Sequence, residues 1–132
     1  MAPTSTTTVL AAGLRDAGFT GRITEPGDPD FDDARKVFNG AIDRRPAAVA
    51  HASDAEDVAA AIRAARAAGL DFTIRAGGHS ISGRSIRDGA LCIDLRGLNA
   101  VRVDPATALV RVGGAAEFRP AVVEAATEYR VG

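Results

Sequence analysis

The sequence predicts an α+β fold in which a small mixed sheet is flanked by helices. The first observation is a strand–helix–strand order: apolar residues 46–52, a helical pattern over 53–68 and a strand-like segment at 72–75. This order is typical of a parallel βαβ unit. The second observation is a hairpin pattern, since residues 101–103 and 109–112 alternate apolar and charged side chains around a turn. The 132 residues have room for one domain with a modest core.

Three shorter elements precede the βαβ unit. Residues 1–8 are polar and aperiodic, so no regular structure is expected there. Residues 9–17 have the pattern of a short helix that ends at Gly18, and residues 21–24 have that of a short strand. Residues 31–38 follow an Asp-Pro-Asp sequence and carry acidic residues early, which favours another short helix.

The helix of the βαβ unit has the clearest boundaries. Ser53 is the expected N-cap, with Glu56 at the third helical position, which is the pattern of a capping box. The helix should end at Ala68-Gly69. We expect a further strand at 90–95 and, after the hairpin, a last helix at 116–129.

Amino-acid composition and net charge limit the kinds of partner that we expect this chain to bind. The net charge is −1 and charges of both signs are interleaved, so we expect neither nucleic acid nor a membrane as partner. The N-terminus has neither the basic nor the apolar part of a secretory signal. The lone Cys92 cannot form an internal disulfide, which favours a cytoplasmic location and a buried structural thiol. The chain's two histidines, His51 and His79, make a metal site improbable, and we expect His51 to be packed or solvated rather than catalytic.

A glycine-rich segment, residues 77–83 (GGHSISG), follows directly on the strand at 72–75. Glycines allow positive φ angles and close approach of a ligand to the backbone. Consecutive N–H groups in such a turn can converge on an anion, and Arg75 adds positive charge beside them. The spacing matches neither the Walker loop nor the Rossmann fingerprint. From the residues alone, a phosphate-binding loop with a nucleophilic His79 and a plain turn with a surface histidine both remain open.

Several motifs in a fixed order make the chain similar to a known family. These segments are Phe38–Gly40, Arg44–Val49, Asp57-Val58, Ile74–Gly83, Ile93–Leu95, Val101–Pro105 and Val112–Ala115. Together they resemble the N-terminal part of the PCMH-type FAD-binding domain of the vanillyl-alcohol oxidase superfamily, and most of all berberine-bridge-enzyme-like oxidoreductases. On this resemblance residues 1–30 are an N-terminal extension and residues 31–132 the N-terminal part of that domain.

The resemblance implies that FAD is the cofactor and that backbone amides of the glycine-rich loop hold its pyrophosphate. It also implies a covalent bond from the histidine at position 79 to the C8 methyl group of the flavin. Neutral imidazole is a suitable nucleophile near neutral pH. Ala76 stands where the family often has glycine, which is a mild departure. The implied cofactor-binding residues are Arg75, Ala76, Gly77, Gly78, His79, Ser80 and Gly83.

The activity implied by the resemblance is that of an FAD-dependent oxidoreductase. Such an enzyme transfers a hydride from an alcohol, sugar or secondary metabolite to flavin N5. No catalytic base can be assigned. We expect the chain to be truncated and incomplete for catalysis, and a second copy of the chain is among its expected partners. The alternative is a non-catalytic flavin- or nucleotide-binding module, or a remnant that acts by associating with another chain.

Overall fold

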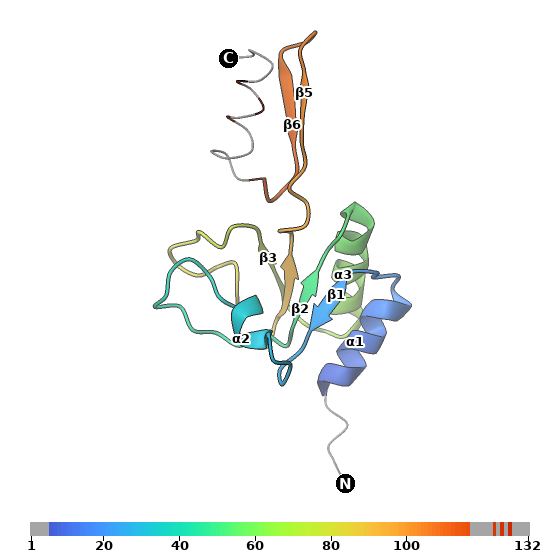
Figure 1. Cartoon of the computed structure of the whole chain (residues 1–132). Helices are drawn as coiled ribbons and strands as arrows, with labels where there is room; N and C mark the ends of the chain where they lie inside the picture. Colours follow the sequence, from blue (N-terminus) through green and yellow to red (C-terminus); the bar gives the residue numbers. More distant parts are fainter. Residues whose placement is uncertain (1–5, 117–122, 124, 126, 128–132) are drawn as a thin grey trace.

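The structure is a computed structural model that describes residues 6–116 together with residues 123, 125 and 127 (Figure 1). The helix expected at 116–129 lies almost entirely outside the described residues. In the part of the chain that is described, no helix has the length and apolar character needed to cross a membrane. The elements, in chain order, are α1 (Thr6–Asp16), β1 (Arg22–Thr24), α2 (Phe31–Ala34), β2 (Ala48–His51), α3 (Ala55–Ala67), β3 (Phe72–Arg75), β4 (Leu91–Asp94), β5 (Val101–Asp104) and β6 (Leu109–Val112).

Four strands form the expected mixed sheet, in the order β1-β2-β4-β3. The first pair, β1 and β2, is antiparallel, whereas β4 runs parallel to both β2 and β3. The two strands that α3 connects, β2 and β3, therefore do not pair directly, because β4 lies between them. All four residues of β4 are buried, as expected for the central strand of a parallel group covered on both faces.

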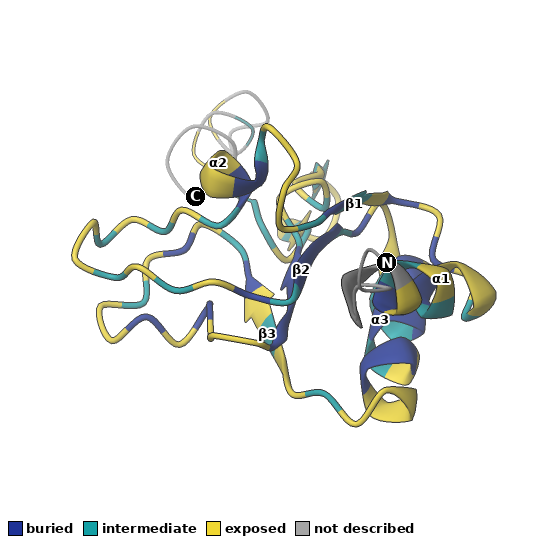
Figure 2. Ribbon diagram, turned by 90° about the horizontal axis from the view of Figure 1, so that it is seen from below, coloured by how far each residue is buried: buried dark blue, intermediate teal, exposed yellow. Residues whose placement is uncertain are grey.

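Side-chain alternation along the strands divides the core into two layers. Ala48 and Ala50 face α1 and α3, together with Leu91 and Ile93 of β4. The intervening Val49 packs on the other face, against α2. Figures 1 and 2 show α1 and α3 on one side of the sheet and α2 on the other. The face of α3 toward the core consists of small side chains, Ala60, Ala61, Ala64 and Ala65.

Cys92 of β4 lies in the smaller of the two core layers, with α2. It is a fully buried free thiol, which confirms the prediction from the sequence. Burial raises the pKa of this thiol to about 11, so the reactive thiolate is disfavoured.

The predicted capping box of α3 was wrong by one residue. The N-cap is Asp54, whose side chain accepts a hydrogen bond from the Asp57 N–H at 2.8 Å. Asp57 in turn accepts from the Ser53 N–H at 2.9 Å and, with its other oxygen, from the Thr20 N–H at 2.7 Å. A carboxylate at each of these two positions satisfies more amides than the predicted pair could, and Glu56 is exposed.

Two helix boundaries also differ from prediction. The first helix begins at Thr6, inside the segment expected to lack regular structure. The second ends at Ala34 rather than at Phe38. The reason for the early end is a tertiary contact, because the Phe38 N–H donates to the carbonyl of Gly78 at 3.1 Å instead of continuing the helix. Residues 6–24, assigned from the sequence to an N-terminal extension, supply α1 and an edge strand of the sheet.

The predicted hairpin is confirmed as a separate two-stranded antiparallel sheet of β5 and β6. It extends away from the main sheet (Figure 1). Its base is held by hydrogen bonds from the Gly113 N–H to the Ala100 carbonyl at 2.8 Å and from the Ala115 N–H to the Leu98 carbonyl at 3.1 Å.

A buried carboxylate marks the end of the central strand. The Asp94 side chain is 1% exposed, and the sheet register places Asp94 between His51 on β2 and Arg75 on β3. Its Oδ2 lies 3.3 Å from His51 Nδ1 and 3.8 Å from Arg75 Nη1, and it accepts from Arg96 Nη2 at 2.6 Å. Burial raises the pKa of Asp94, but the hydrogen bonds from His51 and Arg96 outweigh burial and hold the pKa well below its ordinary value.

The revised N-cap can be tested by alanine substitution. We expect Asp54→Ala to lower the free energy of unfolding by about 1 kcal/mol, since it leaves the Asp57 amide without its acceptor. The control is Ser53→Ala, which should change that free energy by less than about 0.5 kcal/mol because its hydroxyl caps nothing. Urea unfolding of both variants decides between the two caps, and a larger loss in Ser53→Ala would restore the sequence prediction.

The buried carboxylate gives a pH-dependent prediction. Asp94→Asn should cost about 3 kcal/mol of unfolding free energy near neutral pH, because it removes the charge that faces buried Arg75. Since the pKa of Asp94 is lower in the folded chain than its unfolded value of about 3.9, this contribution is present above about pH 4 and is lost as the pH falls further. The stability gap between wild type and variant should therefore narrow in acid.

Urea unfolding at neutral pH and at about pH 3 measures that gap. The matched control is Asp71→Asn, which removes the carboxylate of an exposed ion pair with Arg87 at 2.7 Å and should cost less than about 1 kcal/mol. If the difference in unfolding free energy between wild type and Asp94→Asn is the same at both pH values, the carboxylate does not act through its charge.

Candidate cofactor site

The loop after β3, residues 76–83, requires glycine at two positions for its backbone conformation. Gly78 has φ +69° and Gly83 has φ +71°, both in the left-handed region that disfavours other residues. A Cβ added at Gly83 would also lie 2.8 Å from a methyl carbon of Ile42. The loop thus turns sharply and packs closely on the segment that precedes β2.

The backbone amides are the groups of this loop most available to bind a ligand. Within the described residues, the backbone N–H groups of residues 76–82 donate to no protein acceptor. Pairing resumes at Gly83, whose N–H donates to the Ser80 carbonyl at 3.0 Å, and at Arg84, whose N–H donates to Ser80 Oγ at 3.1 Å. A run of amides without protein partners can bind the oxygens of an anionic ligand.

The segment 37–44 fixes the direction in which several of these amides point. It donates to three loop carbonyls: Phe38 N–H to Gly78 at 3.1 Å, Asn39 Nδ2 to Ile81 at 3.0 Å and Arg44 Nη1 to Gly83 at 2.9 Å. In a trans peptide the N–H points opposite to the C=O. The N–H groups of residues 79 and 82 therefore point away from this segment.

Arg75 lies beneath the loop, and its guanidinium does not reach the exposed side of the loop. Its guanidinium is 7% exposed, and its Nη1 donates to the Ala34 carbonyl at 2.6 Å and faces Asp94. Its Nε has no hydrogen-bond partner, and a Cβ added at Gly78 would lie 3.4 Å from that nitrogen. Burial, together with the charge of nearby Arg96, lowers the pKa of Arg75. A guanidinium is not deprotonated in proteins, so the group still provides a positive charge below the loop.

His79 stands at the exposed side of the loop with its ring between two neighbours. On one side, a Cβ added at Gly77 would lie 2.5 Å from the ring's Cε1 and 2.6 Å from its Nδ1, so only glycine leaves space there. On the other side lies Phe38, with ring centroids 5.3 Å apart and an interplanar angle of 66°. The imidazole is thus accessible to a ligand and also held in place.

The seven residues proposed from the sequence fall into four groups in the structure. The backbone of Ala76, Gly77, Gly78 and Ser80 belongs to the run of unpaired amides. His79 alone among the seven presents a nucleophilic ring to solvent, and Arg75 supplies charge from below. Gly83 shapes the end of the loop.

The residues that support the loop from behind were not predicted as part of the site. Asp94 was noted only within the family segment Ile93–Leu95 and Arg96 not at all, although a carboxylate at the end of an apolar strand is itself a signal of a buried ion pair. His51 is partly buried and hydrogen-bonded to Thr24 Oγ1 at 2.9 Å, in agreement with the expectation that it is packed. Phe38 was assigned to a helix and not to the loop.

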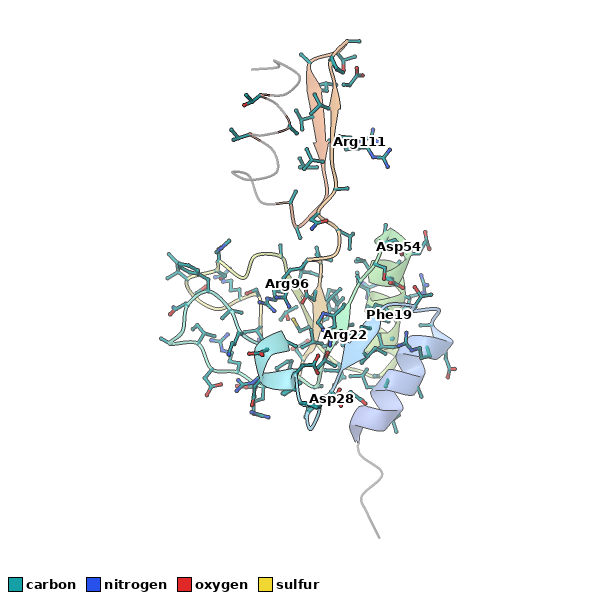
Figure 3. The ribbon with its side chains drawn as sticks, viewed as in Figure 1. Phe19, Arg22, Asp28, Asp54, Arg96 and Arg111 are labelled. Carbon is teal, nitrogen blue, oxygen red and sulfur yellow. The ribbon has the colours of Figure 1, made fainter. Side chains whose placement is uncertain are left out.

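A cavity of about 610 Å³ lies beside these groups, at the carboxyl ends of β2 and β4. In parallel sheets ligands commonly bind at this edge. Figure 3 labels Arg22 and Arg96, two of the residues that line it. The full lining is Arg22, His51, Ala52, Ser53, Asp94, Arg96 and Gly97.

Comparison with known proteins agrees with this geometry. The model of the FAD binding domain family matches residues 46–132. (R)-6-hydroxynicotine oxidase of Paenarthrobacter nicotinovorans is 35% identical over 106 residues, which are 80% of this chain and 23% of the oxidase. FAD-linked oxidoreductase pytB of Aspergillus terreus is 38% identical over 94 residues, 70% of this chain and 12% of that protein.

Solved structures give the same picture. The crystal structure of 6-hydroxy-D-nicotine oxidase from Arthrobacter nicotinovorans superposes with a TM-score of 0.80 at 32% identity and covers 86% of this chain and 25% of its own. A variant of BBE-like 1 from Physcomitrella patens gives a TM-score of 0.82 at 26% identity, over 90% of this chain and 26% of its own. Measured against these structures, the chain spans about a quarter of their length.

These matches confirm the α+β fold of PCMH type that the sequence predicts. The matched region contains both β3 and the glycine-rich loop with its unpaired amides. The chain belongs to the FAD-binding domain family of the vanillyl-alcohol oxidase superfamily, whose members similar to it include FAD-linked oxidoreductases and berberine-bridge-enzyme-like proteins.

Proposed function

We propose that the chain binds FAD for an FAD-dependent oxidoreductase and that the loop at residues 75–83 holds the FAD pyrophosphate. The observation that carries this proposal is the run of unpaired amides at 76–82 above the buried Arg75 guanidinium. A pyrophosphate needs N–H donors and positive charge at its oxygens, and this loop supplies both.

The second part of the proposal is a covalent bond between His79 and the flavin. His79 is exposed at the same loop, so its imidazole can reach a group anchored by the neighbouring amides. One ring nitrogen forms a C–N bond to the C8 methyl carbon. The imidazole N–H and one methyl hydrogen leave as protons, and the two electrons released pass to dioxygen.

The reaction class follows from the cofactor. When bound, FAD accepts a hydride at N5, and the proposed donors are alcohols, sugars or secondary metabolites. The residues of this chain bind and orient the cofactor, which is the protein's part in such chemistry. Since the chain spans about a quarter of its relatives, we further propose that residues 1–132 alone do not turn over substrate.

A second candidate is a flavin-binding module that acts by associating with another chain or a second copy. The observation in its favour is apolar exposure at the sheet edge and on the hairpin. Ile74 of edge strand β3 is 41% exposed and Leu109 of the hairpin is 66% exposed. Edge strands with exposed apolar residues tend to pair with another chain.

The covalent bond is tested by adding FAD to the purified chain and precipitating the protein with acid. We expect yellow colour to remain with the precipitate of the wild type and to be absent from that of His79→Ala, because the substitution removes the nucleophile. The control Cys92→Ala should keep the colour, since the buried thiol is a poor nucleophile at its raised pKa. Acid-stable flavin in His79→Ala would refute the assignment. Wild-type protein that binds no FAD would favour a remnant over a flavin-binding chain.

The pyrophosphate cradle is tested by a pair of glycine variants. Gly78→Ala and Gly89→Ala both place alanine at a left-handed φ, +69° and +71°, so both should lose about 1–2 kcal/mol of stability. Only Gly78 lies in the loop, and a Cβ at Gly89 would touch nothing within 4 Å. We expect flavin fluorescence titration to show at least about tenfold weaker FAD binding for Gly78→Ala alone. Equal loss in both variants would attribute the effect to general destabilisation.

A further inference from the structure

We infer that Phe38 is a positioning residue, whose ring holds the His79 imidazole in the orientation that bonds to the flavin. This inference rests on the proposed covalent attachment at His79. The starting observation is the pair of rings, with centroids 5.3 Å apart and an interplanar angle of 66°. That separation and angle are typical of an edge-to-face aromatic pair, which contributes a modest attraction beyond simple burial.

The placement of Phe38 does not serve the core. Its side chain is 77% exposed, so burial of its apolar surface contributes little to folding. Its position is nevertheless fixed, because its N–H donates to the carbonyl of Gly78, the residue just before His79, at 3.1 Å. The next residue, Asn39, donates through Nδ2 to the Ile81 carbonyl at 3.0 Å. Phe38 is therefore tied by its own N–H to the residue before the histidine, and its neighbour Asn39 is tied by its side chain to the chain on the other side.

On the side opposite Phe38, the imidazole of His79 lies against the backbone of Gly77. The ring occupies the space that a Cβ there would need, at 2.5 Å from Cε1. An exposed histidine without such neighbours samples several rotamers and loses that freedom when it reacts. Phe38 and Gly77 together restrict the ring before the cofactor arrives, and such pre-organisation speeds bond formation.

The inference is tested by the rate at which acid-stable flavin forms after FAD is mixed with the 132-residue chain. Phe38→Ala should slow that rate about three- to tenfold, the range that one edge-to-face pair supports, while the affinity for FAD before the bond forms stays unchanged. Phe38→Tyr keeps the ring and should restore the rate. The control is Val9→Ala, which truncates another exposed apolar side chain, on α1, and should leave the rate unchanged.

A measurement without FAD tests the ring contact itself. In Phe38→Ala the NMR signals of the His79 ring protons should shift, because the ring current of a phenyl group 5.3 Å away is lost. The signals of His51, which is bonded to Thr24 and Asp94, should stay in place and serve as an internal reference. Unchanged His79 signals would overturn the inference even if attachment fails to occur.

The outcomes separate the inference from the function on which it rests. If the wild type forms acid-stable flavin and Phe38→Ala forms it at the same rate, Phe38 does not position His79 and the inference is wrong. If His79→Ala retains the acid-stable flavin, the proposed attachment is wrong. If Phe38→Ala is slower and Phe38→Tyr equally slow, an aromatic ring is not what the site needs, which also overturns the inference.

Discussion

The ion pair between Asp94 and Arg75 is the constraint on which the rest of the site depends. A charge removed from water must face a partner, and each of these two side chains is more than nine-tenths buried. The parallel register brings them to adjacent positions at the carboxyl ends of β4 and β3. Arg96 and His51 complete the set around the carboxylate. This cluster holds the guanidinium of Arg75 inside the protein, where its positive charge lies beneath the glycine-rich loop.

A series of hydrogen bonds that begins at Arg75 sets the geometry of the loop. Arg75 donates to the Ala34 carbonyl at the end of α2. The chain then leaves the helix, and the segment 37–44 donates to carbonyls along the loop. With those carbonyls occupied on one side, the planar peptide groups turn their amides to the other. The unpaired amides of residues 79 and 82 therefore owe their direction to contacts from outside the loop.

Local patterns in the sequence predicted the strand–helix–strand order, the hairpin and the place of the loop, because each depends on residues close together in the chain. The end of α2 could not be predicted, since it is set by a hydrogen bond from Phe38 to Gly78, forty residues further on. The row of His51, Asp94 and Arg75 depends on β4 lying between β2 and β3, an order that no local pattern shows. The cap of α3 was misplaced because Asp57 also binds Thr20, a distant partner.

The positions of the glycine-rich motif are not equivalent, and the structure gives a different reason for each. Gly78 and Gly83 are needed for a left-handed backbone, whereas Gly77 is needed because the imidazole of His79 occupies the space of its Cβ. Ala76 has no such requirement, since the group it contributes to the run of unpaired amides is one that every residue except proline possesses. The departure from glycine at this position therefore leaves that run intact, while alanine at any of the three glycines would disturb the backbone or the ring of His79.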